Sequence, residues 1–238
     1  MPKRIASGSR IVVLSGAGLS RASGIPTFRD ADGLWEGHDI LQVATPAAWQ
    51  RDRALVRKFY DERRSSCAAV IPNEGHTALA RLQHTLGTKR CTLVTQNIDG
   101  LLQKASADEV IEMHGSLFRL RCSSHADHPR ISIFGPQSSD RRCTICGAFL
   151  RPDIVWFGEL PYEMDRIQQA TAEADLFVSV GTSGVVYPAA GLVEIAHSYG
   201  AHTVEINPIP TEGAFEEVIA EPAETALPRL VRDWLGES

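Results

Sequence analysis

Short apolar segments that run directly into turns of small residues are the feature of this 238-residue chain that most restricts its fold. The first segment is Arg10–Leu14, which leads into Ser15-Gly16-Ala17-Gly18. Continuous apolar runs of this length are typical of strands that are buried on both faces of a sheet. Four further segments predict strands of the same kind: Cys91–Thr95, Val110–Glu112, Leu176–Val180 and Thr203–Ile206.

Helical patterns lie between several of these segments. Asn73 can cap a helix whose apolar face carries Leu79 and Leu82, and Gly87 is placed to end it. A second helix is predicted over Glu163–Ala174. Because apolar strands alternate with helices, we predict an α/β fold, a Rossmann-like doubly wound parallel sheet covered on both faces. Ligands of such folds bind beyond the carboxyl ends of the strands.

Two stretches depart from this alternation and predict a smaller module. One is a helical insertion that is rich in arginine and aromatic residues and has no expected strand, and the other is polar with proline and cysteine, like a zinc ribbon. We therefore expect one domain over residues 1–238 with two lobes. The large lobe comprises residues 1–37, 73–118 and 153–238, and the small lobe residues 38–72 and 119–152.

Composition and charge exclude several classes of protein. The net charge of −5 argues against nucleic acid as the main partner, because binding to phosphates favours a basic surface. No apolar run approaches the roughly 20 residues that cross a bilayer, and the N-terminus lacks the apolar stretch of a signal peptide. We therefore expect a cytoplasmic protein with no membrane association. Three of the five cysteines lie between Cys122 and Cys146, which favours a metal site over disulfides.

The glycine turn after the first strand is a signal for phosphate binding. Glycine lets a backbone approach a pyrophosphate, and N–H groups at a helix start attract anions. The same turn also occurs as a plain tight connection between a strand and a helix. A dehydrogenase would have a third glycine where Arg21 stands, so the turn argues against hydride transfer.

The residues that follow are far more specific. The run Gly16–Asp30, followed by Asp32-Gly33-Leu34-Trp35, resembles the signature of the sirtuins, which are NAD-dependent protein deacylases. Three further motifs occur in the family's order, and the resemblance spans about residues 10 to 230: Thr95–Gly100, Met113-His114-Gly115 and Val180–Ser183. Two segments depart from the family, Asn207-Pro208-Ile209 and Glu221-Pro222-Ala223, so the resemblance is weakest at the adenosine end of NAD.

The resemblance implies a reaction in which NAD is consumed as a co-substrate. The acyl oxygen of a modified lysine attacks the ribose carbon that carries nicotinamide, and the products are nicotinamide, free lysine and O-acyl-ADP-ribose. His114 would be the catalytic base for a ribose hydroxyl, and Asn97 would act beside the ribose. By itself, His114 could equally be a core histidine bonded to the backbone, although an unperturbed imidazole suits a base at neutral pH.

The same resemblance implies the residues that contact NAD. Ile98 and Asp99 would hold the nicotinamide carboxamide, Gln96 would orient ribose hydroxyls, Phe28 would shield the reactive face, and Arg29 would order the loop over NAD. The full implied set is Gly16, Ala17, Gly18, Ser20, Thr27, Phe28, Arg29, Trp35, Gln96, Asn97, Ile98, Asp99, Gly181, Thr182, Ser183, Asn207 and Ala223.

Tyr60 and Arg63 are three residues apart in a helical stretch and therefore share a face. That spacing alone is more typical of a solvated basic helix with a half-buried tyrosine. Together with Ala44-Thr45-Pro46, however, it resembles the class III sirtuins, whose acyl pocket has a Tyr-x-x-Arg pair. The resemblance implies a preference for succinyl- or malonyl-lysine with some deacetylation, because arginine binds carboxylates bidentately. Ala44 would leave room for the longer acyl chain.

Val155, Trp156, Phe157 and Gly158 could form a plain buried strand. In the family, the matching stretch pairs with an extended substrate peptide through main-chain hydrogen bonds. The implied partners are therefore proteins that carry acylated lysines, and main-chain pairing predicts weak sequence preference. The oligomeric state is not predicted.

The cysteine-rich stretch predicts a structural zinc site with ligands Cys122, His125, Cys143 and Cys146. Cys-x2-His paired with Cys-x2-Cys can bind zinc tetrahedrally. His128 is a second candidate for the fourth ligand, and a lobe that folds without metal is the alternative.

Three other functions are compatible with parts of the pattern. Mono-ADP-ribosyl transfer to protein would use the same electrophile with another acceptor. A non-catalytic NAD-sensing module would have no need of a base such as His114. The small lobe could also dock partner proteins.

Overall fold

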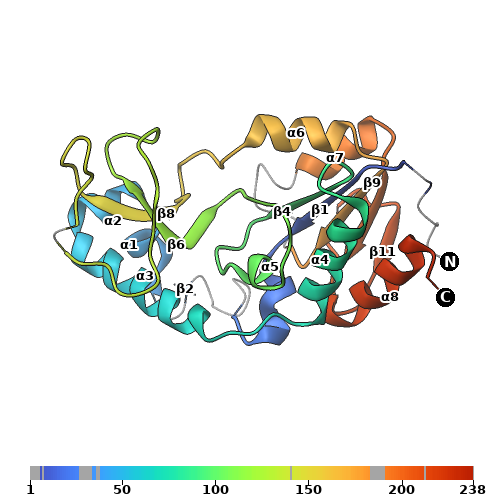
Figure 1. Ribbon diagram of the computed structural model, residues 1–238, viewed down its shortest axis with the longest axis horizontal. Coiled ribbons are helices and arrows are strands. Elements are labelled where there is room, and N and C mark those ends of the chain that lie inside the picture. Colours follow the sequence, from blue (N-terminus) through green and yellow to red (C-terminus); the bar gives the residue numbers. More distant parts are fainter. Residues whose placement is uncertain are drawn as a thin grey trace.

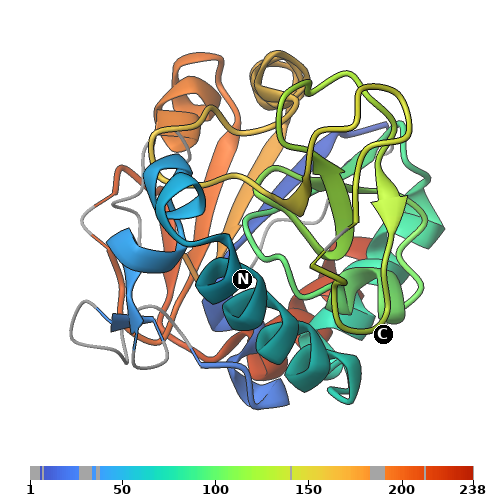
Figure 2. The same cartoon turned by 90° about the vertical axis from the view of Figure 1, so that its left-hand side faces the viewer.

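A computed structural model describes residues 6, 8–26, 34–35, 38–139, 141–182, 191–211 and 213–237 of the chain. Two groups of elements are visible along its long axis (Figure 1). We call the six-stranded sheet with its covering helices the large lobe. The small lobe is the group of helices around a three-stranded sheet, which faces the viewer in Figure 2.

The large lobe is built on a parallel sheet. Its strands are β11 (Glu217–Ile219), β10 (His202–Ile206), β9 (Leu176–Val180), β1 (Ile11–Ser15), β4 (Cys91–Thr95) and β5 (Val110–Glu112), in that spatial order. From β1 the chain moves outward to β4 and β5, then returns to β9 on the other side of β1. The strand order therefore reverses between β1 and β9, which is where open α/β sheets bind ligands.

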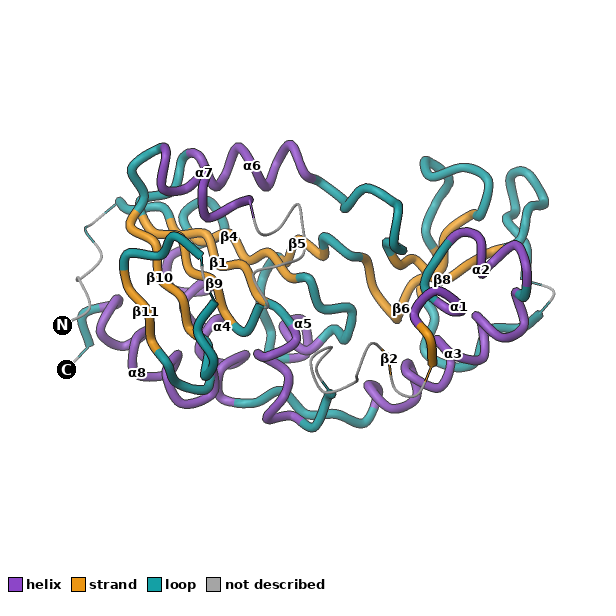
Figure 3. The backbone as a smooth tube through the Cα atoms, turned by 180° about the vertical axis from the view of Figure 1, so that it is seen from behind, coloured by secondary structure: helices purple, strands orange, loops and turns teal. Residues whose placement is uncertain are grey.

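Helices cover both faces of this sheet, as Figures 1 and 3 show. Helices α4 (Glu74–Leu86) and α8 (Ala223–Leu235) pack side by side on one face, and α6 (Met164–Ala172) and α7 (Leu192–Ser198) pack on the other. Two apolar clusters fill the two interfaces, and alternate residues of β1 enter each: Ile11 and Val13 on one side, Val12 and Leu14 on the other. The predicted doubly wound fold is confirmed.

The predicted caps of α4 are also present. The Asn73 side chain accepts hydrogen bonds from the N–H groups of Gly75 and His76, and Gly87 ends the helix. Helix α6 lies within the predicted range Glu163–Ala174. Two short helical segments follow β1 and β4: the 3-10 helix η1 (Ala17–Ser23) and α5 (Leu101–Lys104).

The small lobe combines helices α1 (Ile40–Val43), α2 (Pro46–Arg51) and α3 (Arg53–Ala68) with an antiparallel sheet. The sheet has the order β7 (Ile131–Ser132), β6 (Gly115–Cys122), β8 (Leu150–Ile154). An aromatic core joins the two parts, with Trp49, Phe59, Tyr60 and Trp156 among its members.

The prediction that residues 38–72 hold no strand was wrong in one detail. His38–Asp39 (β3) pairs with Leu34–Trp35 (β2) in a two-residue ladder. A ladder this short has no detectable period, so the pattern of apolar residues could not reveal it.

Strand β6 begins one residue after His114 and carries the chain from the large lobe into the small lobe. Gly115 at this junction has a φ of 85°, and a Cβ placed there would lie 1.9 Å from the Asp153 carbonyl oxygen. Only glycine fits this position, so the backbone at the junction is closely constrained. Among the described residues, every helix is too short or too polar to cross a bilayer.

Candidate active site

The carboxyl ends of the sheet strands bring together segments that lie far apart in the sequence. Hydrogen bonds link them directly: the Asn97 side chain donates to the Gly16 carbonyl at 3.0 Å, and the Asn207 side chain donates to the Thr182 carbonyl at 2.8 Å. The N–H of Gln96 donates to the carbonyl of Ser15, the last residue of β1. The predicted residues after β1, β4, β9 and β10 therefore form one continuous rim.

Close contact between two turns explains the glycines of this rim. A Cβ on Gly18 would lie 2.6 Å from the Gly181 Cα, and one on Gly16 would lie 2.8 Å from the Gly181 carbonyl oxygen. The N–H of Gly16 donates to Val180 and that of Gly18 donates to Gly181, each at 2.9 Å. These two N–H groups are thus already bonded to Val180 and Gly181, and only glycine allows the two turns to approach so closely.

A buried hydrogen-bond network lies behind the rim. The Ser20 hydroxyl donates to Asp99 Oδ2 at 2.6 Å and accepts from the Asn97 side chain at 3.1 Å. His76 Nδ1 accepts from the Asn73 N–H, so its Nε2 carries the proton and donates to Ser20 Oγ at 3.3 Å. The network fixes the segment 96–99 against η1 and the start of α4.

Burial changes the proton affinity of two groups in this network. It raises the pKa of Asp99, against the opposing effect of the hydrogen bonds from Ser20 and the Leu101 N–H. It lowers the pKa of His76 to about 4, because the charged imidazole would lose its hydration. His76 was not predicted as a site residue, because its connection to Ser20 joins positions 56 residues apart.

His114 lies directly after β5 and Met113, at the junction between the lobes. Its Nδ1 lies 3.1 Å from the Gln96 carbonyl oxygen, which can only accept a hydrogen bond. Nδ1 therefore carries the proton, and Nε2 holds the lone pair that a base requires. Burial lowers the pKa of His114, and the hydrogen bond to Gln96 offsets this only in part. The neutral imidazole is consequently the dominant form at neutral pH.

Tyr60 on α3 is fully buried in the small-lobe core, in the same apolar cluster as Ala44 and Trp156. The Trp156 indole N–H donates to the Tyr60 hydroxyl oxygen at 2.9 Å. Burial raises the pKa of Tyr60, so the hydroxyl keeps its proton. Arg63, one turn further along, is also buried and lies against the Phe59 ring, with one N–H group donating to the Phe59 carbonyl. The predicted acyl-pocket residues thus share one region.

The segment Val155–Gly158 forms a turn after β8 rather than a strand. The N–H groups of Val155 and Phe157 donate to the carbonyls of His114 and Ala44. The Trp156 side chain points into the core, whereas Phe157 is 51% exposed. This segment therefore lies between the predicted base and the predicted acyl pocket.

The structure places His128, and not the predicted His125, with the three cysteines. The structure brings together Cys122, His128, Cys143 and Cys146, whose ligand atoms all lie within 4.8 Å of one another. His128 Nδ1 is 3.3 Å from Cys143 Sγ, whereas His125 is exposed and stacks on the His128 ring. The turn after Cys122 directs the Ser124 N–H at the Cys122 sulfur, and the next side chain then points outward.

The chemistry of this cluster suits a thiophilic cation such as zinc. A tetrahedral site with Zn–S bonds of about 2.3 Å separates its ligand atoms by about 3.8 Å, close to the spacing here. Backbone N–H groups of Cys146 and Ile145 bond to the Cys143 sulfur and lower the pKa of its thiol to about 6, which favours the thiolate that a metal binds.

Several predicted contacts fall outside the described residues: Thr27, Phe28, Arg29 and Ser183. Trp35 is described only as part of β2. The remaining predicted residues are placed at the rim or beneath it. Ala17 begins η1, Ile98 packs against the small-lobe core, and Ala223 is buried at the start of α8.

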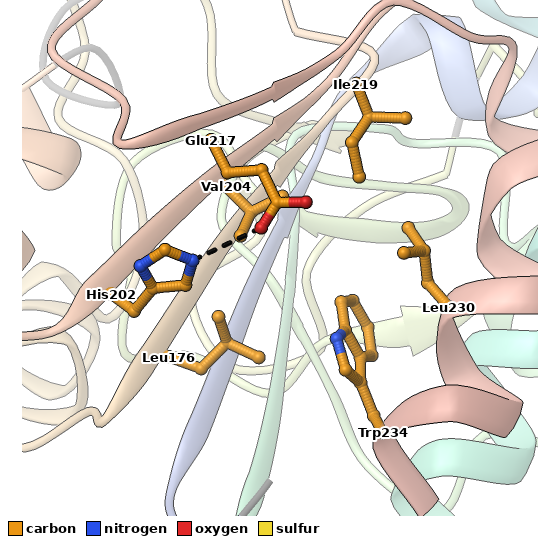
Figure 4. Close-up of a pocket in the computed structure, with 7 residues that line it drawn as sticks. All are labelled: Leu176, His202, Val204, Glu217, Ile219, Leu230 and Trp234. Atoms are coloured by element: carbon orange, nitrogen blue, oxygen red, sulfur yellow. Dashed lines mark hydrogen bonds and ion pairs between the residues drawn. The ribbon is translucent and has the colours of Figure 1, made fainter. Parts of the chain in front are cut away.

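A small cavity of about 10 Å³ lies elsewhere, between the sheet and α8 (Figure 4). Leu176, His202 and Glu217, which line it, are the first residues of β9, β10 and β11. It therefore opens at the amino ends of the strands, away from the rim. Its volume is about the space of one water molecule, so it is too small for a nucleotide.

Comparison with known proteins agrees with this geometry. The Sir2 family model matches residues 16–188. An "NAD-dependent protein deacylase" of Yersinia pseudotuberculosis is 48% identical over 231 residues, which cover 94% of this chain and 82% of that protein. Proteins of the same description from Escherichia coli K12 and Pasteurella multocida are 47% and 45% identical, covering 95% of this chain and 82% and 98% of theirs.

Solved structures give the same result. A Sir2 homologue in complex with NAD superposes with a TM-score of 0.85 at 34% identity, covering 96% of this chain and 91% of that one. A mutant Sir2 homologue in complex with ADP ribose superposes with a TM-score of 0.86 at 34% identity, covering 96% of this chain and 93% of that one.

Proposed function

This chain belongs to the Sir2 family, and we propose that it is an NAD-dependent protein deacylase that prefers succinyl- or malonyl-lysine and retains some deacetylase activity. Its products are nicotinamide, unmodified lysine and O-acyl-ADP-ribose. The observation that carries the general activity is His114, a buried neutral imidazole whose Nε2 lone pair is left available by the hydrogen bond to Gln96. The acyl preference rests on Tyr60 and Arg63.

His114 is the base of the reaction. It must take a proton from a ribose hydroxyl, and its Nε2 is the only ring nitrogen that can accept one while Nδ1 donates to Gln96. The lowered pKa keeps the imidazole neutral without any charged partner, which suits a base at neutral pH.

The rim residues hold NAD, which when bound supplies an electrophilic ribose carbon with nicotinamide as the leaving group. The hydrogen bonds from Ser20 to Asp99 and from Asn97 to Ser20 support this assignment, because they fix the segment 96–99 at the rim. Asp99 and Ile98 hold the carboxamide, Asn97 and Gln96 the ribose. The backbone of Gly181 and Thr182, with Asn207, holds the adenosine half. Phe28 and Arg29, which lie outside the described residues, are assigned to the nicotinamide side by the family resemblance alone.

The acyl pocket is formed by Ala44, Tyr60 and Arg63. Because the indole of Trp156 donates to the Tyr60 oxygen, the Tyr60 O–H hydrogen is directed away from that indole. The Arg63 guanidinium is buried and can bind the carboxylate of a succinyl or malonyl group bidentately. An acetyl group has no carboxylate and does not make this interaction. Such a charge-assisted bond contributes about 1.5–3 kcal/mol, which corresponds to roughly ten- to a hundredfold in preference.

The substrate peptide lies along Val155–Gly158. Since the N–H groups of Val155, Trp156 and Phe157 already donate within the chain, this edge offers carbonyl oxygens to the peptide. Recognition through main-chain atoms predicts a weak preference for the sequence around the modified lysine.

The thiol cluster holds zinc in a structural role, through Cys122, His128, Cys143 and Cys146. These residues lie in the small-lobe sheet and its loops, so the metal stabilises that sheet and takes no part in the reaction of NAD.

The experiment incubates the protein with NAD and matched acetyl-, malonyl- and succinyl-lysine peptides and follows the products by mass. We expect nicotinamide and O-acyl-ADP-ribose, with the larger kcat/KM on the succinyl and malonyl peptides. Release of no nicotinamide with any peptide would refute the deacylase. ADP-ribose attached to protein in place of acyl-ADP-ribose would indicate mono-ADP-ribosyl transfer.

Arg63→Met tests the acyl preference. We expect kcat/KM on the succinyl peptide to fall about ten- to a hundredfold, with a much smaller change on the acetyl peptide. Lys58→Met, which removes an exposed cation from the same helix, is the matched control and should change neither value. An equal fall on both peptides would contradict the role of Arg63 in binding a carboxylate.

A further inference from the structure

Arg151 and Glu159 form a nearly buried ion pair beside the acyl pocket, and the reaction proposed above assigns no role to it. The Arg151 side chain donates to both carboxylate oxygens of Glu159, at 2.7 and 2.8 Å. Arg151 is 4% exposed and lies on β8, and Glu159 lies at the end of the turn that follows. This bidentate geometry is the strongest form of such a pair.

The carboxylate of Glu159 also closes the turn that carries Phe157. Glu159 Oε2 accepts from the Trp156 N–H at 2.9 Å, and the Glu159 N–H donates to the Trp156 carbonyl at 2.9 Å. Gly158 within the turn has a φ of 89°, which favours glycine. The Glu159 carboxylate therefore adds a side-chain contact to the backbone hydrogen bonds that hold the exposed Phe157 segment.

The guanidinium of Arg151 contacts the Trp156 side chain directly. It lies over the Trp156 ring, 3.4 Å from the ring centroid, and donates to the Ile154 carbonyl at 2.7 Å. The Trp156 indole in turn donates to the Tyr60 hydroxyl. A continuous series of contacts thus runs from the ion pair through Trp156 to the hydroxyl of the acyl pocket.

Both members of the pair are charged at neutral pH. Burial alone would raise the pKa of Glu159, but the hydrogen bonds and positive charge of Arg151 outweigh it and lower the pKa, so the carboxylate stays ionised. Arg121 adds a second cation 3.9 Å from Glu159 Oε1. The ion pair is therefore a fixed support rather than a group that gains or loses a proton during the reaction.

We propose that Arg151 and Glu159 are positioning residues for substrate selection: the pair holds Trp156, and through its indole the Tyr60 hydroxyl, in the arrangement that recognises an acidic acyl group. Neither side chain touches the acyl-lysine. This inference rests on the proposed acyl preference, because the hydroxyl it positions is the one assigned to the acyl carboxylate.

The test compares wild type, Glu159→Gln and Arg151→Lys on matched succinyl and acetyl peptides. Glu159→Gln keeps the shape of the side chain and one acceptor for the Trp156 N–H but removes the negative charge. Arg151→Lys keeps the positive charge but removes the guanidinium that donates to both carboxylate oxygens. We expect both to lower the ratio of kcat/KM for succinyl over acetyl by about tenfold, and to raise KM for peptide while KM for NAD stays near wild type. Arg130→Met, which removes a cation from the buried Asp153 in the same lobe, is the control and should keep the wild-type ratio.

Combination with Tyr60→Phe distinguishes positioning from a general loss of stability. If the pair acts through the Tyr60 hydroxyl, Glu159→Gln should have no further effect on the succinyl-to-acetyl ratio in the Tyr60→Phe background. A wild-type preference for succinyl that Glu159→Gln and Arg151→Lys leave intact, or effects that simply add, would overturn the proposal. A wild type that does not prefer succinyl would instead overturn the acyl preference itself.

Discussion

At the scale of single residues, the hydrogen bond from His114 to the Gln96 carbonyl decides what the imidazole can do. A carbonyl cannot donate, so the tautomer with a proton on Nδ1 is fixed, and Nε2 is left with its lone pair. Because no carboxylate is involved in this contact, burial dominates and lowers the pKa. His114 is thereby prepared as a base rather than as an electrostatic partner.

The pH dependence of activity should follow from this pKa. Only the neutral imidazole accepts a proton, so kcat/KM should fall on the acid side with a midpoint below 6.5, the ordinary value of histidine. The measurement is kcat/KM on an acyl peptide from about pH 5 to about pH 9. The residual kcat/KM of His114→Ala should not show this fall on the acid side. A midpoint above 6.5 would mean that a cation-stabilising partner acts on His114 in the enzyme.

At the scale of elements, the metal cluster links the ends of a sheet that has little apolar surface of its own. Cys122 is the last residue of β6, Cys143 and Cys146 precede β8, and His128 precedes β7. The apolar cluster of this sheet is small, with Leu120, Ile133 and Leu150 at its centre. A cation bound at the four ligands would therefore supply stability that burial cannot.

Metal content should depend on His128 and not on His125. We expect about one zinc per chain in protein purified without a histidine tag, much less in His128→Ala, and an unchanged content in His125→Ala. Elemental analysis after gel filtration is the measurement, and the two histidines serve as each other's control. Loss of zinc from His125→Ala alone would show that the turn after Cys122 adopts another conformation. Wild type with far less than one zinc per chain would refute the site.

Sequence patterns were sufficient to predict most strands of the six-stranded sheet. Strands β1, β4, β5, β9 and β10 were predicted, because each lies in a short, largely apolar run of the sequence. Strands β1 and β9 are buried throughout, whereas β5 lies at the sheet edge and is only partly buried. Strand β11 was missed, since it has three residues, begins with Glu217 and exposes Val218 at the sheet edge. The small-lobe strands were missed because arginine and proline interrupt their apolar positions, as in Leu150–Ile154.

At the scale of the whole molecule, His76 connects the start of α4 to η1 and the loop after β4. It is 1% exposed, and its pKa of about 4 lies below the ordinary value of 6.5. The unfolded chain therefore binds a proton more readily than the folded chain between these two values. The folded state loses stability as the pH falls through this window, whereas above about 6.5 His76 imposes no such penalty.

Unfolding in urea at a series of pH values tests this. The free energy of unfolding of wild type should fall between pH 6.5 and 4 with a contribution of about 3 kcal/mol from His76. His76→Gln should be less stable at neutral pH but should lose less on acidification. His84→Gln, which removes an exposed histidine from the same helix, should follow wild type. If the free energy of unfolding changes with pH in the same way in all three proteins, His76 is excluded as the source of acid sensitivity.

The sequence by itself determined the fold class, the positions of five strands along the chain and the family, because apolar runs, capping residues and contiguous motifs are local properties of the chain. Tertiary structure decided the tautomer of His114, the choice of His128 over His125, and the support of Trp156 by Arg151 and Glu159. Each of these depends on the direction of a side chain toward a partner from another segment or across a turn. Packing fixes such directions, and residue spacing alone does not.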